Sequence, residues 1–350
     1  MKKKILIICM VILLIVSTIA ISVFLFIKGK MSKINVENIN TANLGINETE
    51  RNNPINNYRN IAILGIDSRY NDYEDFSRTD CIMIASINKN NNEVNLFSIY
   101  RDTLVQMDLY NKTRVDKINH AYYGGVENTL KTINENFDLN VKEYVMVDFE
   151  AVAKVVDQVD GIELNITADE LKYINSYIKG NNQANKSSSK EITKTGLQKV
   201  DGNQALAYAR IRYTEGSDYK RAERMRTVLT KVFDKIKKKD IFEINKIVNK
   251  ILPTVKTNLT QSDILDFSTK VINISLNSAF GFPYKCEDKV LDLKDYYEGT
   301  TKGKDSYTVP TQLTEDVKRL HQELFKDNEY NVPDSLNTIW ENIKAQGKVK

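Results

Sequence analysis

The pattern of hydrophobic and polar residues first sets apart the beginning of the chain. Residues 5–27 carry no charged side chain and are mostly Ile, Leu, Val, Met and Phe. As a helix this segment reaches about 34 Å, enough to cross the hydrocarbon core of a bilayer. It is longer than the apolar core of an ordinary signal peptide, and no small-x-small cleavage pattern follows it. We therefore predict an uncleaved transmembrane anchor at residues 5–27.

The residues on either side of this segment set the expected topology. Lys2, Lys3 and Lys4 precede it, so the positive-inside rule places residues 1–4 in the cytoplasm. Lysines after the anchor weaken that bias, but no second apolar span follows. We therefore expect a single-pass protein of the cell membrane whose remaining chain lies outside the cell.

Polar residues then separate the anchor from a folded domain. Residues 28–57 are rich in Asn and show little periodicity, which is typical of a flexible tether. The remaining residues, about 290, are enough for one domain with a substantial core. We place that domain at residues 58–325 and a C-terminal tail at residues 326–350.

Short apolar runs predict the strands of this domain. Residues 60–66 form a continuous apolar run that ends at Asp67, as expected for a central strand buried on both faces. Residues 81–87 and 94–99 are two further runs, joined by turn-forming residues 88–92. The sequence therefore predicts three strands near the start of the domain.

Helical spacing alternates with the strands. After a pair of glycines, apolar residues recur at helical spacing through residues 126–137. Residues 144–149 then predict a strand, and residues 151–159 a short helix that ends at Gly161. This alternation argues for a layered α/β domain.

Two later segments differ in character. Residues 181–190 contain mostly Asn, Gln, Ser and Lys, which is typical of a low-complexity surface loop. Residues 205–213 alternate as a strand does, and this alternation places Tyr208, Arg210 and Arg212 on one face.

A long amphipathic helix is expected next. Ser217 or Asp218 can cap its beginning, and residues 225–236 supply its apolar stripe. Arg221 and Arg224 each lie four residues before a member of that stripe. We therefore expect both arginines on the buried side of the helix instead of its solvent face.

Composition excludes several classes of function. The net charge is only +4 over 350 residues. A basic run formed by Arg226, Lys231, Lys235 and residues 237–239 is expected outside the cell, so a solvated helix face explains it better than DNA binding. With only two histidines the chain cannot form a zinc site of several histidines, and no Walker-type loop is present. Cys81 and Cys286 are the cysteines outside the anchor, and nothing in their spacing requires a disulfide.

Acidic residues at strand ends and closely spaced arginines stand out instead. They occur in the segments 64–69, 77–80, 98–102, 209–212 and 218–224. Several guanidinium groups that converge predict binding of phosphate or pyrophosphate. Asp67 and Asp80 can hold a Mg²⁺ ion that binds the same phosphate, and the helix that begins near Ser217 adds its dipole.

Surface ion pairs are the alternative explanation. They account well for a single exposed arginine. They account poorly for Arg210 and Arg212, because two like charges on one strand face repel each other unless an anion lies between them. They also fail to explain why Arg221 and Arg224 extend an apolar stripe.

In these segments the chain resembles the LytR-CpsA-Psr family of cell-wall polymer ligases. The resemblance extends from about residue 58 to residue 233, and more weakly to residue 325. The motifs occur in family order: Gly65-x-Asp67-Ser-Arg69, Arg78-Thr-Asp80, Arg101-Asp102, Lys117-Ile-Asn119, Arg210-x-Arg212 and Asp218-x-x-Arg221-x-x-Arg224.

The resemblance implies a fold and an activity. The fold is a three-layer α/β/α sandwich with a central mixed sheet. The activity is a phosphotransferase that moves a glycan phosphate from a polyprenyl-pyrophosphate carrier, whose lipid lies in a hydrophobic tunnel, onto peptidoglycan or another envelope acceptor. Nucleic acid is not an expected partner.

The resemblance also implies roles for individual residues. Asp67 and Asp80 match the Mg²⁺ site, and Asp80 and Arg101 are the catalytic candidates. The pyrophosphate clamp comprises Arg78, Arg101, Arg210, Arg212 and Arg221, with Arg69 and Arg224 as further candidates.

Three departures from the family pattern leave details open. Tyr100 stands where Pro is usual, Asp160 where Gly is common and Met225 where Gln often follows the second arginine. The first two alter loop geometry, whereas Met225 removes a polar contact expected at the headgroup. Two other functions remain open, a non-catalytic regulatory protein that binds the lipid pyrophosphate and a hydrolase of the pyrophosphate bond.

Overall fold

The computed structural model describes residues 35–47, 54–66, 78–293 and 304–349 of the chain. The predicted anchor at residues 5–27 lies outside these ranges, as do Asp67 and Arg69. No helix within the ranges is long and apolar enough to cross a membrane. The structure thus describes most of the predicted domain and parts of the segments on either side of it.

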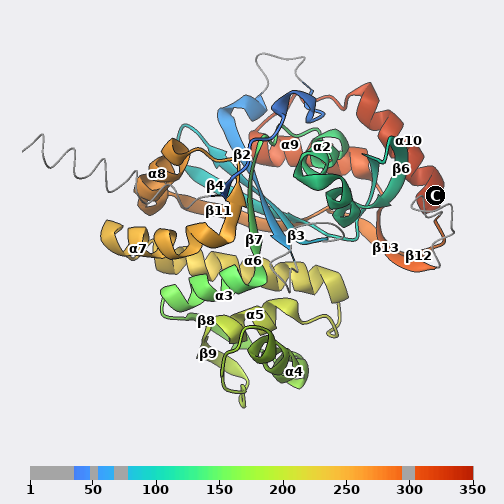
Figure 1. Cartoon of the computed structure of the whole chain (residues 1–350). Helices are drawn as coiled ribbons and strands as arrows, with labels where there is room; N and C mark the ends of the chain where they lie inside the picture. The colour runs from blue at the N-terminus through green and yellow to red at the C-terminus, as the bar shows by residue number, and fades with distance from the viewer. Residues whose placement is uncertain (1–34, 48–53, 67–77, 294–303, 350) are drawn as a thin grey trace, which may run out of the picture.

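A mixed sheet of seven strands lies at the centre of the described residues (Figure 1). In spatial order its strands are β1 (Asn35–Val36), β10 (Val255–Thr257), β7 (Glu143–Asp148), β2 (Tyr58–Ile66), β3 (Thr79–Asn88), β4 (Glu93–Ile99) and β11 (Ser275–Phe282). The pairs β1–β10, β7–β2 and β4–β11 are parallel, and the other neighbours are antiparallel. The strands predicted at residues 60–66, 81–87, 94–99 and 144–149 are confirmed as β2, β3, β4 and β7.

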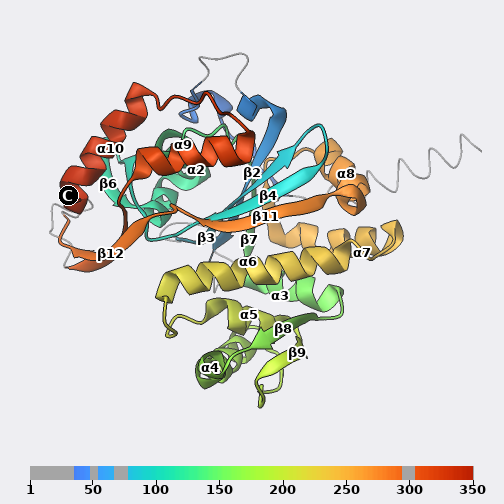
Figure 2. The same cartoon turned by 180° about the vertical axis from the view of Figure 1, so that it is seen from behind.

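Helices cover both faces of the sheet (Figures 1 and 2). One face packs against α2 (Gly125–Phe137), α9 (Leu313–Phe325) and α10 (Asp334–Gly347). The other packs against α3 (Phe149–Gln158), α5 (Gly202–Arg210) and α6 (Ser217–Ile236), with α4 (Ala168–Ala184) beyond α5. At one end of the molecule lie α7 (Ile241–Ile251) and α8 (Gln261–Lys270). The predicted mixed sheet between helical layers is confirmed.

Residues of β2 show why the central strand is a continuous apolar run. Ala62 and Leu64 point into the core under α2 and α9, whereas Ile63 packs against the core on the opposite face. Successive side chains of a strand point to opposite faces, so a strand covered on both faces needs apolar residues at every position.

Shorter elements complete the described fold. Three antiparallel ribbons pair β5 (Leu104–Leu109) with β6 (Lys112–Lys117), β8 (Ile162–Ile166) with β9 (Gly196–Val200), and β12 (Cys286–Leu291) with β13 (Asp305–Pro310). The 3₁₀ helices are η1 (Thr41–Asn43), η2 (Pro54–Asn57), η3 (Ile118–Gly124), η4 (Leu252–Thr254) and η5 (Val271–Asn273).

The strand predicted at residues 205–213 is wrong, because most of this segment is helix α5. The Asp201 side chain accepts from the Gln204 amide, and the Gln204 side chain accepts from the Asp201 amide, which together form a capping box. The alanines and leucine that follow favour a helix. Arg210 therefore ends α5, and Arg212 lies in the loop beyond it instead of sharing a strand face with Arg210.

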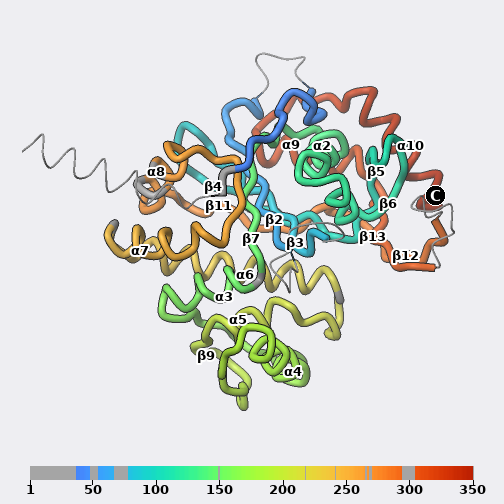
Figure 3. Tube along the Cα trace, viewed as in Figure 1, coloured from blue at the N-terminus to red at the C-terminus, as the bar shows by residue number. Residues whose placement is uncertain are grey.

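Segments predicted as tether and tail also differ from expectation where the structure describes them. Within residues 28–57, β1 pairs with β10 and Leu44 is buried in the core beside α2, a course that Figure 3 traces. Within residues 326–350, α10 buries Trp340 and Ile343. Isolated apolar residues such as Leu44 fill core positions without any period that a sequence pattern can detect.

Two boundaries also shift. The surface loop predicted at residues 181–190 begins later, because α4 continues to Ala184 and buries Asn181. The N-cap of α6 is Gly216, which has φ of +83°, and not Ser217 or Asp218. Asp218 lies in the first turn of α6, where its carboxylate contacts Arg101.

Candidate functional site

Asp80 and Arg101 meet at one edge of the sheet because of strand register. In the antiparallel pair β3–β4, Ile82 pairs with Ile99. Asp80 lies two residues before Ile82 and Arg101 two residues after Ile99, so both side chains reach the same edge. Arg101 Nη1 donates to Asp80 Oδ1 over 2.6 Å.

Two more arginines converge on the same carboxylate. Arg221 Nη2 of α6 lies 2.9 Å from Asp80 Oδ2, and Arg212 Nη2 of the α5–α6 loop lies 3.3 Å from the same oxygen. Arg221 is buried, as its place beside the apolar stripe of α6 predicts, whereas the Arg212 side chain is 44% exposed. Three guanidinium groups thus surround Asp80, one from each of three separate segments.

These arginines control the ionisation of Asp80. Burial opposes ionisation of this carboxyl, but the charges of Arg221 and Arg101 outweigh that effect and lower its pKa to about 2. Asp80 is therefore a carboxylate at neutral pH. A base of such low pKa accepts a proton poorly, so this arrangement suits a counterion or metal ligand better than a general base.

Acidic residues hold Arg101 on its other sides. Arg101 Nε lies 3.2 Å from Asp218 Oδ1, and Arg101 Nη2 lies 3.4 Å from Asp102 Oδ2. Burial favours the neutral guanidine, but Asp102, Asp80 and Asp218 outweigh it and raise the pKa of Arg101. Asp218, which the sequence suggested as a helix cap, instead helps to orient Arg101.

The motif at residues 117–119 supports the turn that carries Arg101. The Asn119 amide donates to the Arg101 carbonyl over 3.1 Å. Lys117 Nζ lies 3.7 Å from Asp102 Oδ1 and 2.8 Å from Asp305 Oδ2. The backbone and the acidic neighbour of Arg101 are thus both held by this segment.

Tyr100 gives a physical reason for one departure from the family pattern. Its amide donates to the Phe282 carbonyl of β11 over 3.2 Å, a bond that proline has no N–H to make. Its ring packs edge-on against Tyr219 of α6, with ring centroids 4.6 Å apart. In this chain Tyr100 therefore links the loop that carries Arg101 to β11 and α6.

Of the three arginines around Asp80, Arg212 carries the least compensated positive charge. Burial lowers the pKa of Arg212, and the charges of Arg221 and Arg101 lower it further, while Asp80 and Asp218 oppose this shift. Because the Arg212 guanidinium lies close to these like charges and reaches solvent, an added anion beside it would be stabilised.

Two other arginines predicted for the pyrophosphate clamp, Arg78 and Arg210, bond to residues of other elements. Arg78 Nε donates to the Tyr123 hydroxyl over 2.6 Å, with the guanidinium over the Tyr123 ring. Arg210 Nη1 donates to Asn181 Oδ1 of α4 over 2.9 Å. The structure therefore unites Asp80, Arg101, Arg212 and Arg221 as a cluster, hereafter the arginine cluster.

Arg224 is buried on the neighbouring side of α6. It donates to Glu170 Oε1 over 2.7 Å, to the Ile211 carbonyl over 3.1 Å and to Thr214 Oγ1 over 2.6 Å. These bonds fix the loop that carries Arg212. Arg224 thus acts on the cluster by positioning this loop.

An apolar cavity of about 340 Å³ lies between the sheet, α3 and α6. Its walls include Ile63, Ala85, Val147, Val152, Leu229 and Val232. A much smaller cavity, about 20 Å³, lies beside the arginine cluster and is lined by Arg221 and Met225. Successive turns of α6 therefore border first a charged site and then an apolar one, an adjacency that the sequence did not reveal.

Asp80 is the predicted Mg²⁺ ligand that the described residues include. They contain no group of three or more His, Cys, Asp or Glu that could hold a metal. Mg²⁺, however, commonly takes only one or two protein carboxylates and completes its shell with water and phosphate oxygens. An ionised Asp80 therefore has the donor chemistry for such an ion, and the second predicted ligand, Asp67, lies outside the described residues.

Comparison with known proteins identifies relatives. Residues 22–312 match the model of the LytR_cpsA_psr family. The polyisoprenyl-teichoic acid–peptidoglycan teichoic acid transferase TagU of Enterococcus faecalis is 28% identical, over 75% of this chain and 78% of its own length. The enzyme of the same description named TagT, from Bacillus subtilis, is 30% identical, over 64% of this chain and 68% of its own length.

Solved structures share the fold. A crystal structure of TagT from B. subtilis matches with a TM-score of 0.57 and 25% identity, over 81% of this chain and 97% of that one. A structure of TagT with bound octaprenyl pyrophosphate lipid matches with a TM-score of 0.56 and 24% identity, over 82% of this chain and 99% of that one.

Proposed function

The chain belongs to the LytR_cpsA_psr family, and we propose that it transfers a glycan phosphate from a polyprenyl-pyrophosphate carrier onto peptidoglycan or another envelope acceptor. The names of the relatives TagU and TagT, teichoic acid transferases, support this class of reaction. Lipid-linked wall glycopolymers are accordingly the proposed substrates.

The arginine cluster beside an apolar cavity is the observation that carries the proposal. A pyrophosphate headgroup needs several charge-assisted donors, which Arg101, Arg212 and Arg221 supply. A prenyl chain needs an apolar enclosure, which the cavity along Leu229 and Val232 supplies. The octaprenyl pyrophosphate lipid bound to TagT supports the same pairing of headgroup and lipid.

Asp80 neutralises the arginines until the substrate arrives. Both its oxygens accept from guanidinium groups, as pyrophosphate oxygens would. An incoming pyrophosphate therefore takes the place of Asp80 at Arg212 and Arg221. Before substrate binds, the one negative charge of Asp80 offsets part of the positive charge of the three arginines, with Asp102 and Asp218 as further acidic partners. The exchange leaves Asp80 free to hold Mg²⁺, which would neutralise further phosphate oxygens.

The chemical step then needs charge stabilisation and alignment. An acceptor hydroxyl attacks the phosphorus that bears the glycan, its proton is released, and the bond from this phosphorus to the bridging oxygen breaks. Polyprenyl phosphate leaves with that oxygen, and the glycan phosphate becomes a diester on the acceptor. Arginines that remain in place stabilise the charge on the transferred group and on the leaving phosphate.

A turnover assay with the detergent-solubilised full chain tests this function. A polyprenyl-pyrophosphoryl disaccharide and peptidoglycan fragments are supplied with Mg²⁺, and mass spectrometry detects the glycan-phosphate adduct and polyprenyl phosphate. Arg101→Ala and Asp80→Ala should abolish transfer, whereas Arg319→Ala on the exposed side of α9 should not. Full activity in both site variants would contradict the proposal.

The same assay separates the alternatives. Release of free glycan phosphate at an equal rate with and without acceptor would identify a hydrolase. Tight binding of the carrier with no turnover under any condition would identify a non-catalytic regulatory protein.

A further inference from the structure

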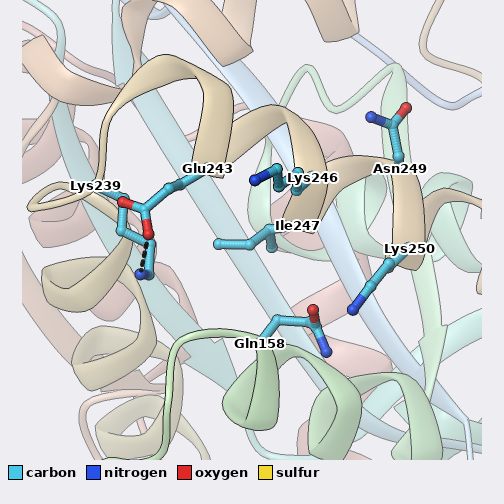
Figure 4. Close-up of a pocket in the computed structure, with 7 residues that line it drawn as sticks. All are labelled: Gln158, Lys239, Glu243, Lys246, Ile247, Asn249 and Lys250. Carbon is cyan, nitrogen blue, oxygen red and sulfur yellow. Dashed lines mark hydrogen bonds and ion pairs between the residues drawn. The ribbon is translucent and has the colours of Figure 1, made fainter.

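A cavity of about 400 Å³ borders α7, at the end of α6 opposite the arginine cluster. It is lined by Gln158 of α3 and by Lys239, Glu243, Lys246, Ile247, Asn249 and Lys250. In Figure 4, Lys239 pairs with Glu243, and Lys250 extends from α7 toward Gln158. Lys246 and Lys250 are exposed. This cavity therefore presents ammonium groups to solvent.

The surroundings of the cavity concentrate positive charge. Residues 235–250 contain six lysines and two acidic residues, a net charge of +4 that equals the net charge of the whole chain. The rest of the chain is thus neutral overall. A surface that gathers the entire net charge in one short segment attracts a polyanion there.

An apolar side chain stands among these lysines. Phe242, in the first turn of α7, is 75% exposed. A single exposed apolar residue needs no explanation, but a large aromatic residue within a basic amphipathic segment is typical of helices that bind a membrane interface.

The course of the chain places this end of the domain near the membrane. Strand β1 begins at Asn35 and pairs with β10, which follows α7 through η4. Only eight residue steps separate Asn35 from the end of the predicted anchor at residue 27, and a fully extended chain covers at most about 28 Å over that length. The edge of the sheet beside α7 and α8 is therefore held close to the bilayer that the anchor would cross.

We propose that residues 235–250 form a docking surface for the anionic phospholipid headgroups of that bilayer, with Phe242 inserted at the interface. Lysine ammonium groups contact the phosphates, and the cavity beside Lys246 and Lys250 accepts a headgroup. The short link to the anchor makes the contact intramolecular, so weak individual interactions suffice.

This orientation also bears on the carrier, in a step that rests on the proposed function. The apolar cavity beside α6 extends to Leu259 and to Phe267 of α8, at the end that faces the bilayer. A prenyl chain can thus lie between the membrane and the arginine cluster, because the part of α6 from Arg221 to Ile236 spans about 22 Å.

Quenching of tryptophan fluorescence in vesicles tests the docking surface without any turnover, so its result is independent of transferase activity. The full chain, whose single Trp340 is buried in α10, is reconstituted in phosphatidylglycerol with brominated acyl chains. Phe242→Trp adds a probe at the proposed interface. Val290→Trp adds a matched probe at a position 66% exposed on β12, at the opposite end of the molecule (Figure 1).

We expect the emission added by Phe242→Trp to be quenched by the brominated lipid and that added by Val290→Trp to remain unquenched. In the Phe242→Trp protein, Lys246→Glu with Lys250→Glu should abolish the quenching, whereas the control pair Lys112→Glu with Lys318→Glu, on exposed lysines of β6 and α9, should preserve it. High salt should weaken the quenching as the charge reversal does.

Equal quenching at both tryptophan positions, or none at position 242, would overturn the proposal. So would quenching that survives reversal of both lysines. A change in the emission added by Phe242→Trp that appears only when purified wall polymer or another protein is added would assign the surface to that partner and not to lipid.

Discussion

Arg221 of α6 and Asp80 of β3 form a buried ion pair with 2.9 Å between Nη2 and Oδ2. Both side chains are less than a tenth exposed, at 4% and 8%. The contact ties the helical layer to the sheet at the arginine cluster, where charge and position depend on each other.

Replacement of Arg221 should show what its positive charge contributes to the site. Among the neighbouring charges, that of Arg221 lowers the pKa of Asp80 the most. Arg221→Ala removes this charge, so the pKa of Asp80 should rise. We expect transfer to fall by about 100-fold or more, because a donor to the pyrophosphate is lost. Steady-state kinetics measure this, with Arg319→Ala as the control. Unchanged turnover in Arg221→Ala would remove Arg221 from the clamp.

Asp80 should make stability depend on acid. Its folded pKa of about 2 lies below the ordinary value of 3.8, so its contribution to stability is fully present above the ordinary value and is lost as pH falls toward the folded one. Between about pH 4 and pH 2 the free energy of unfolding should fall by about 2 kcal/mol more in the unchanged protein than in Asp80→Asn. Urea unfolding at several pH values measures the difference. Asp234→Asn, at an exposed position of α6, should behave as the unchanged protein.

Arg224 should matter for stability first and for activity second. Arg224→Ala leaves Glu170 buried without its partner, a change that costs about 3–5 kcal/mol. Arg224→Met with Glu170→Gln should recover part of that loss, because neither residue is then a buried unpaired charge. Thermal unfolding measures both variants. If Arg224→Ala kept full stability and lost activity, Arg224 would instead act directly on the substrate.

The apolar cavity should discriminate carriers by lipid length. Leu229→Trp fills space along α6 that a long prenyl chain would occupy. We expect the KM for a long-chain carrier to rise several-fold, with little change for a carrier whose lipid is too short to reach the cavity. Leu197→Trp, on the exposed face of β9, controls for the added ring. An equal effect on both carriers would place the lipid elsewhere.

Removal of metal tests the Asp80 ligand. Chelation with EDTA should lower transfer by the unchanged protein, and added Mg²⁺ should restore it. Asp80→Asn and Asp67→Asn should each lose activity that Mg²⁺ no longer restores at ordinary concentrations. Transfer that is insensitive to EDTA would show that the arginines alone neutralise the phosphate.

Much of the layered fold follows from local pattern. Residues 61–66 are apolar at every position because β2 is covered on both faces, and this physical requirement is visible in the sequence. The buried placement of Arg221 and Arg224 likewise follows from helical spacing, which carries any residue on the stripe to the same face.

Residues 205–213 show where local pattern is ambiguous. Alternation of Tyr208, Arg210 and Arg212 is compatible with a strand, yet the capping box at Asp201 and the helix-favouring alanines decide for α5. The sequence contains the capping box as Asp201-x-x-Gln204, and that spacing is the local signal that predicts the helix.

The sequence by itself determined which residue types carry the chemistry of this protein, since the order of its aspartate and arginine motifs is sufficient to recognise the family. Only the tertiary structure decided which of them act together. Asp80, Arg101, Arg212 and Arg221 meet through strand register, a loop held by Arg224 and the packing of α6 on the sheet, whereas Arg210 is carried to α4. Contacts between residues so distant in the chain depend on the relative placement of whole elements, for which no local spacing contains information.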